Sequence, residues 1–194
     1  MILPILKYGH PALRQKGARI PEITPQVQRL IADMFDTMYA AAGIGLAAQQ
    51  VGQALQLTVL DIRGVKDRPS TLEEAGFPLD PESRMPLVLI NPELTLSGIP
   101  LLGPEGCLSF PELYEDILRA PVAEVMATGE KGEKVHFKAG GLLARAIQHE
   151  TDHLNGILFI DRMAIAAKKA LKPELEALQA GTRAELDRKK AGGK

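Results

Sequence analysis

The first clear helical pattern follows Thr24. Apolar residues at positions 27, 30, 31, 34 and 38 recur at intervals of three and four, which places them on one face of an α-helix. Thr24 and Pro25 suit the N-cap and the first helical position, so we expect the helix to begin there. It should end between Ala40 and Gly43, because residues 43–46 are too rich in glycine for a stable helix and predict a tight backbone segment.

Short apolar runs further along the chain predict buried strands. One covers residues 57–62, and a second covers residues 87–90 and should end at Asn91-Pro92. The polar stretch between them, residues 63–86, contains four prolines. It predicts a long surface loop, with a short helix around residues 72–75.

The second half of the chain predicts a hairpin and two helices. Residues 122–128 and 135–138 can pair across residues 129–134. A helix should follow Gly140-Gly141, cover residues 142–154 and stop at Asn155-Gly156, which suit positive φ. A final, highly charged helix should cover residues 173–190. Several strands and few helices, without βαβ alternation, predict an α+β fold.

The helix over residues 142–154 carries the pattern H-E-x-x-H at His149, Glu150 and His153. Residues four apart on a helix lie about 5–6 Å apart at Cβ, so both histidines can bind one metal ion. Their face is continued backwards by Ala146 and Leu142 and should point toward the core. Glu150 flanks the metal position and can accept a proton from a water whose pKa the ion lowers to about 7.

A catalytic metal site needs a third protein ligand besides two histidines. The candidates are His10, His136, Cys107, Glu174 and Glu176. Cys107 lies in residues 103–111, GPEGCLSFP, where glycine and proline predict an exposed, irregular backbone instead of a packed strand. In such a segment, a role of the cysteine sulfur as a metal ligand is favoured over a role of the side chain in packing. The sulfur would bind the metal as the thiolate.

The H-E-x-x-H motif also occurs in other kinds of metal site. The metzincin pattern requires a third histidine at position 159, where this chain has Phe159, so that class is excluded. An endopeptidase of the H-E-x-x-H class, with its third ligand downstream, stays open. So does a structural site in a binding module, which would take its fourth ligand from His10 or His136 because structural zinc sites are closed by four protein ligands.

Composition sets broader limits. The 194 residues fit one domain, and 45% apolar and 24% charged residues are typical of globular proteins. The net charge of −1 gives no general attraction to DNA or to an anionic membrane, so we expect neither as a partner. Pro4 and Lys7 interrupt what would be the apolar region of a signal peptide, and the single cysteine allows no internal disulfide. We therefore expect a cytoplasmic location.

Three motifs together resemble those of the bacterial-type peptide deformylases. They are GIGLAAQQ at residues 43–50, EGCLS at residues 105–109 and QHETDHLNG at residues 148–156, in the order of that family. The resemblance covers roughly residues 1–165. It implies small antiparallel sheets packed around the H-E-x-x-H helix, with a C-terminal helix outside. It also implies a metal-dependent amidase that removes the formyl group from the N-terminal formyl-methionine of nascent polypeptides and releases formate.

The resemblance assigns roles to matching residues. The implied metal ligands are Cys107, His149 and His153. Glu150 would be the general base and then the general acid, while the amide of Gln50 and the backbone N–H of Leu108 would stabilise the oxyanion. The usual metal of such enzymes is Fe²⁺, which zinc, nickel or cobalt can replace. Gln49 occupies the free position of the first motif.

The substrate site should lie beside the H-E-x-x-H helix. Ile44, Leu142 and Ala146 are the expected lining of a methionine pocket, with the stem of Arg145 at its mouth. The peptide main chain would pair with exposed backbone at Gly45 and Gly106, where glycine permits close approach.

The sequence differs from the family pattern in two places. The segment 63–86 is longer than most relatives have, and Ala41 and Ala42 stand where many carry acidic residues, which leaves the partner of Arg119 undetermined.

Residues 168–194 hold eight Lys or Arg and four Asp or Glu, a net charge of +4. We therefore divide the chain into a catalytic domain, 1–165, and a C-terminal helix with a basic tail, 166–194. This tail is a candidate ribosome-binding element.

Overall fold

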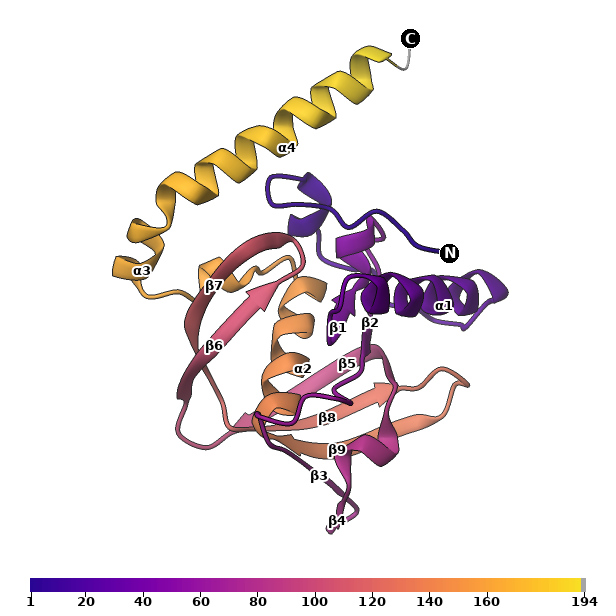
Figure 1. Cartoon of the computed structure of the whole chain (residues 1–194). Coiled ribbons are helices and arrows are strands. Elements are labelled where there is room, and N and C mark those ends of the chain that lie inside the picture. The colour runs from indigo at the N-terminus through magenta and orange to yellow at the C-terminus, as the bar shows by residue number, and fades with distance from the viewer. Residues whose placement is uncertain (193–194) are drawn as a thin grey trace.

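The computed structural model describes residues 1–192, and Figure 1 shows that helix α2 lies at the centre of the molecule. Seven antiparallel strands form the main sheet, in the order β1-β2-β5-β8-β9-β3-β4. In that order they span Gly45–Ala47, Leu57–Leu60, Leu87–Ser97, Val122–Thr128, Lys134–Gly140, Ser70–Glu74 and Phe77–Leu79. A separate antiparallel pair is formed by β6 (Leu101–Cys107) and β7 (Phe110–Arg119).

In the described part of the chain, four α-helices accompany the sheets. They are α1 (Pro25–Ala40), α2 (Gly141–Leu154), α3 (Ile165–Ala170) and α4 (Lys172–Gly192). Four short 3₁₀ helices lie at Pro11–Arg14, Ala48–Val51, Pro81–Arg84 and Phe159–Asp161. The predicted α+β class, with antiparallel sheets around the H-E-x-x-H helix and a C-terminal helix outside, is confirmed. Within residues 1–192, no helix is both long and apolar enough to cross a membrane.

Helix α2 is held in place by its apolar side chains. Leu143, Ala144 and Ile147 have no exposed surface and pack in one core cluster with residues of β2, β5, β8 and β9. Burying an aliphatic side chain of this size contributes about 1.5–3 kcal/mol, so the helix cannot shift without a large loss. The same packing fixes the residues on its next turns. Gly156, at φ 72°, ends the helix in the left-handed conformation expected for its sequence.

Several elements were predicted correctly because their signals are local. Helix α1 begins at Pro25, with the Thr24 hydroxyl accepting a 3.4 Å hydrogen bond from the Val27 N–H. Strands β8 and β9 pair as the predicted hairpin. Near the start of α4, Leu175 packs in a core cluster with Leu13 and Phe159.

Three expectations about strands were wrong. Residues 72–75 form no helix, since β3 pairs with β9 and then turns into β4 at Ala75 and Gly76, both at positive φ. Strand β5 does not end at Asn91-Pro92 but continues to Ser97, because a bulge between Ile90 and Glu93 accommodates the proline. The expected tight segment at residues 43–46 partly forms the short strand β1.

The backbone around Cys107 is also more regular than expected. Cys107 is the last residue of β6, and this strand pairs with β7 over its whole length. The glycines and prolines of residues 103–111 are compatible with β6 because it pairs with a neighbour on one side only.

Candidate active site

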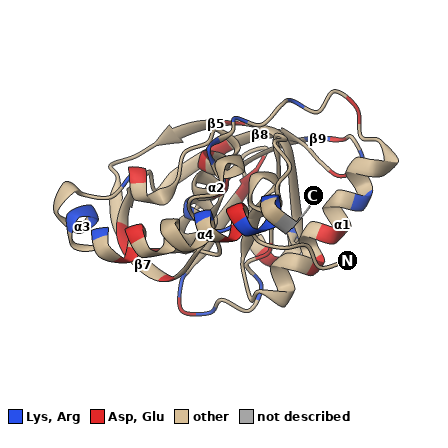
Figure 2. Cartoon of the chain, turned by 90° about the horizontal axis from the view of Figure 1, so that it is seen from above, with Lys and Arg blue, Asp and Glu red and all other residues tan. Residues whose placement is uncertain are grey.

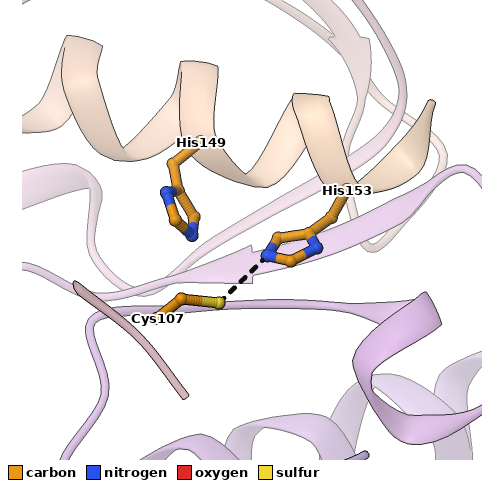
Figure 3. Close-up of side chains that lie close together, drawn as sticks. All are labelled: Cys107, His149 and His153. Carbon is orange, nitrogen blue, oxygen red and sulfur yellow. Dashed lines mark hydrogen bonds between the residues drawn. The ribbon is translucent and has the colours of Figure 1, made fainter. Parts of the chain in front are cut away.

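Two elements bring together a cluster of potential metal ligands. Cys107 comes from the end of β6, and His149 and His153 come from successive turns of α2 (Figure 3). Their ligand atoms all lie within 4.8 Å of one another, and the Cys107 Sγ is 3.3 Å from the His153 Nε2. Among the described residues this is the cluster of His, Cys, Asp and Glu with metal-binding geometry.

The alternative third ligands lie elsewhere. His10 caps a 3₁₀ helix through its Nδ1, which accepts a 3.2 Å hydrogen bond from the Ala12 N–H. His136 lies on β9 at 2.8 Å from Glu124. Glu174 and Glu176 lie on α4, outside the cluster.

The donor set fits a divalent ion of intermediate softness. A thiolate and two imidazoles are suitable ligands for Zn²⁺ or Fe²⁺. Three protein ligands would leave one coordination position for water or substrate. The Nδ1 of His149 lies 2.9 Å from Glu105 Oε2, which leaves Nε2 available to a metal. Burial lowers the pKa of His153, which favours the neutral ring. Burial acts in the same direction on His149, but Cys107 and Glu105 outweigh it and raise its pKa.

A buried network supports the histidine ligands. The Glu105 carboxylate accepts hydrogen bonds from Arg119 at 2.9 and 3.0 Å and from Arg145 at 2.9 Å, besides its contact with His149. Burial would raise the pKa of Glu105, but the bonds to His149 and Arg119 outweigh it and hold the pKa well below its usual value. Arg119 also donates to Asp152 at 2.5 Å. The partners of Arg119 are thus Glu105 and Asp152, so Arg119 does not need an acidic residue at position 41 or 42.

Glu105 and Asp152 received no role from the sequence. Both lie inside the recognised motifs, one or two positions from a proposed ligand. This proximity in the sequence was the feature that could have indicated a role for them. The Glu105 carboxylate contacts His149, and both Glu105 and Asp152 form ion pairs with Arg119.

Glu150 lies beside the cluster in a dry environment. Burial raises its pKa to about 7, and its Oε2 has no hydrogen-bond partner among the described residues. A Cβ on Gly45 would lie only 2.4 Å from the Glu150 Oε1. The carboxylate therefore occupies the space that any side chain at position 45 would need.

The two glutamines of the first motif have different environments. The Gln50 Oε1 accepts a 2.9 Å hydrogen bond from the Ala47 N–H, which directs its amide group toward Cys107 and Ser109, at 3.5 and 3.2 Å. Gln49 instead points into the core and donates to the Leu154 carbonyl at 3.2 Å.

A groove of about 490 Å³ opens beside the cluster. It is lined by all the predicted substrate residues, Ile44, Gly45, Gly106, Leu142, Arg145 and Ala146, and by Gln50, Leu108 and Glu150. Within the described residues, strands β1 and β6 each pair with one neighbour and have one free edge, and these strands form the walls of the groove. A Cβ at Gly106 would lie 2.5 Å from the exposed Tyr114 ring, which would have to move to accept it. The Arg145 guanidinium is bound to Glu105 and to three carbonyls, so its position is fixed.

An α+β fold with a Cys/His/His cluster and a glutamate next to the first histidine defines a metallohydrolase of the H-E-x-x-H class. The sequence model described as polypeptide deformylase matches residues 2–169. The chain therefore belongs to the polypeptide deformylase family.

Individual relatives agree over nearly the whole chain. Peptide deformylase of Methylacidiphilum infernorum is 46% identical, covering 93% of this chain and 95% of the relative. That of Opitutus terrae is 43% identical, covering 95% and 96%. Among solved structures, a peptide deformylase from Legionella pneumophila has a TM-score of 0.78 at 34% identity, covering 93% and 96%. Members of this family remove the N-formyl group from nascent peptides, and this metal-dependent hydrolysis is the activity of the chain.

Proposed function

We propose that Cys107, His149 and His153 bind one divalent metal ion and that Glu150 transfers the protons during hydrolysis of the formyl amide. The observation that carries this assignment is the convergence of the three ligand atoms within 4.8 Å, at the side of the groove that contains Glu150. When bound, the ion polarises the formyl carbonyl and lowers the pKa of a coordinated water to about 7.

Glu150 is suited to both proton transfers. With its pKa raised to about 7 by burial, the carboxylate can accept a proton from the attacking water and then give it to the leaving amine. We assign the role of oxyanion donors to the Gln50 amide, which lies 3.5 Å from the Cys107 Sγ, and to the Leu108 backbone N–H. The loss of one such donor typically lowers the rate by about 10²–10³.

The substrate would enter as an added strand. The peptide main chain pairs with the free edges at Gly45 and Gly106, as in other cases of strand addition. The methionine side chain enters the apolar part of the groove at Ile44, Leu142 and Ala146, with the Arg145 stem at its mouth. This arrangement leaves the formyl group next to Cys107 and Glu150.

We propose Fe²⁺ as the native ion, with zinc, nickel or cobalt as possible replacements. The anionic thiolate of Cys107 makes a bound ion a weaker Lewis acid than three neutral imidazoles would. An unhindered formyl group suits such a centre.

A direct experiment separates this function from the protease alternative. Purified protein is offered formyl-Met-Ala-Ser and casein, each at several enzyme concentrations. Formate release without casein cleavage supports the proposal, while casein cleavage without formate release contradicts it.

We further assign the protein to the cytosol and propose that the tail after the 1–165 catalytic domain contacts the ribosome. Basic residues on α4 include Arg183, Arg188, Lys189 and Lys190, interspersed with acidic residues (Figure 2), while Lys194 lies outside the described residues. Each contact with RNA phosphate would gain by counterion release. Deletion after Gly181 should lower ribosome co-sedimentation and leave activity on free peptides intact. Equal sedimentation of both forms would refute this role.

A further inference from the structure

The segment between β2 and β3 ends at the N-terminal end of α2. The Leu142 N–H donates a 3.0 Å hydrogen bond to the Pro69 carbonyl, and the Leu143 N–H donates to the Ser70 hydroxyl at 3.1 Å. Figure 1 shows this segment running from β2 to the end of α2 before it enters β3. Arg68, which directly precedes Pro69 and lines the groove, is therefore held near the N-terminal end of α2.

Arg68 reaches from this anchor across to the other wall of the groove. Its guanidinium donates a 3.1 Å hydrogen bond to the Pro104 carbonyl, and the side chain is part of the groove lining. Pro104 is in β6, three residues before Cys107. Since a strand advances about 3.3 Å per residue, Arg68 stands roughly 10 Å along the strand from the metal cluster.

The charge of Arg68 is available to a ligand. Its hydrogen bond within residues 1–192 is to a neutral carbonyl, and no carboxylate of that range forms an ion pair with it. The other charged groups near this end, Glu105 and Arg145, are bound to each other at 2.9 Å. Lys7 and Glu112 also line the groove, but at its opposite end, near the β6–β7 turn, where Lys7 donates to the Leu108 carbonyl.

We propose that Arg68 is a specificity-determining residue that favours an acidic side chain in the two positions after the formyl-methionine. This inference rests on the proposed function, because it takes the peptide to lie along β6 with its formyl group at Cys107. In that orientation, the residues that follow methionine run from Gly106 toward Pro104 and come within reach of the guanidinium. A basic side chain there would be repelled, and a neutral one would be intermediate.

The test compares peptides that differ only in charge. Formyl-Met-Glu-Ala, formyl-Met-Gln-Ala and formyl-Met-Lys-Ala amides, and the corresponding formyl-Met-Ala-Xaa amides, are assayed with the metal-loaded enzyme. We expect kcat/KM to be roughly fivefold higher for Glu than for Lys in at least one series, mainly through KM, and the ratio to fall at high salt. Arg68→Gln should bring this ratio to about one, while Arg68→Lys should retain most of it.

Lys66→Gln is the matched control, because it removes one positive charge from the same segment at a residue that pairs with Glu82 outside the groove. Its Glu/Lys ratio should equal that of the wild type. Equal kcat/KM for all peptides, or an unchanged Glu/Lys ratio in Arg68→Gln, would overturn the role of Arg68 and leave the proposed function intact. If none of the peptides released formate, the proposed function would fall together with this inference.

Discussion

Glu105 Oε2 lies 2.9 Å from the Nδ1 of His149, so an acidic residue on β6 orients a proposed metal ligand on α2. The same carboxylate binds the guanidinium groups of Arg119 and Arg145. One buried side chain thus joins the small β6–β7 sheet to the central helix and fixes the ring that faces Cys107. Carboxylates in this position typically strengthen metal binding by a histidine.

Glu105→Gln should therefore bind metal about 10–100-fold more weakly than the wild type. It should also lower the free energy of unfolding by roughly 3 kcal/mol, because a buried arginine loses a charged partner. Metal titration and urea denaturation measure the two effects. Asp116→Asn, at an exposed position on β7, is the control and should change neither. Full metal affinity in Glu105→Gln would show that the contact with His149 does not orient the ligand.

Cys107→Ser should lose most of its metal, since a neutral hydroxyl is a poor ligand for a site built on a thiolate. His136→Gln should keep a full complement, because His136 pairs with Glu124 away from the cluster. Metal content per protein, measured after dialysis, compares the variants directly. The assignment fails if Cys107→Ser retains as much metal as His136→Gln.

Gly45→Ala tests the close contact between β1 and Glu150. The new Cβ would lie 2.4 Å from the Glu150 Oε1, so the carboxylate must move. We expect activity to fall by about 10²-fold, since misplacing a catalytic group by roughly 1 Å has that effect. Gly181→Ala, with nothing within 4 Å of its Cβ, is the control and should retain wild-type activity. Wild-type turnover by Gly45→Ala would mean that the observed position of Glu150 is not required.

Asp61 should make stability depend on pH in the acid range. Burial would raise the pKa of Asp61, but hydrogen bonds from Arg63 and Tyr39 outweigh it and hold the pKa below its usual 3.8. A carboxylate with a lowered folded-state pKa stabilises the protein above its unfolded pKa of about 3.9, and that stability is lost as pH falls through the folded value.

Asp61→Asn should accordingly be less stable than the wild type at pH 7, and the difference should shrink below about pH 4. Urea denaturation between pH 3 and pH 7 provides the measurement. Asp67→Asn, which changes an exposed residue, should follow the wild type at every pH. A constant difference between Asp61→Asn and wild type down to pH 3 would contradict the assignment.

The sequence predicted the elements whose signals are local. The apolar spacing and the Thr24 cap fix α1, and the H-E-x-x-H spacing alone places His149 and His153 on one face. Residues 72–75 are good helix formers, yet residues 72–74 end strand β3, because β9 supplies the hydrogen bonds, and Ala75 lies in the turn into β4. Strand β9 is more than sixty positions away in the sequence, so no local pattern could indicate that it pairs with β3.

The supporting residues of the site were beyond sequence reasoning for the same reason. Glu105 contacts Arg119, Arg145 and His149, which are 14, 40 and 44 positions away. Arg68 reaches Pro104 over 36 positions. Such contacts depend on how α2, β6 and the 63–86 segment come together, which only the folded structure reveals.

The central claim is tested most directly by formate release from formyl-Met-Ala-Ser, with the metal content measured on the same oxygen-free preparation. We expect wild-type protein carrying about one divalent ion per chain to release one formate for each free methionine amine. Glu150→Ala should keep that metal content and lose about 10²–10⁴-fold in rate. Metal-loaded wild-type protein that releases no formate, or Glu150→Ala that retains more than about a tenth of the activity, would contradict the account.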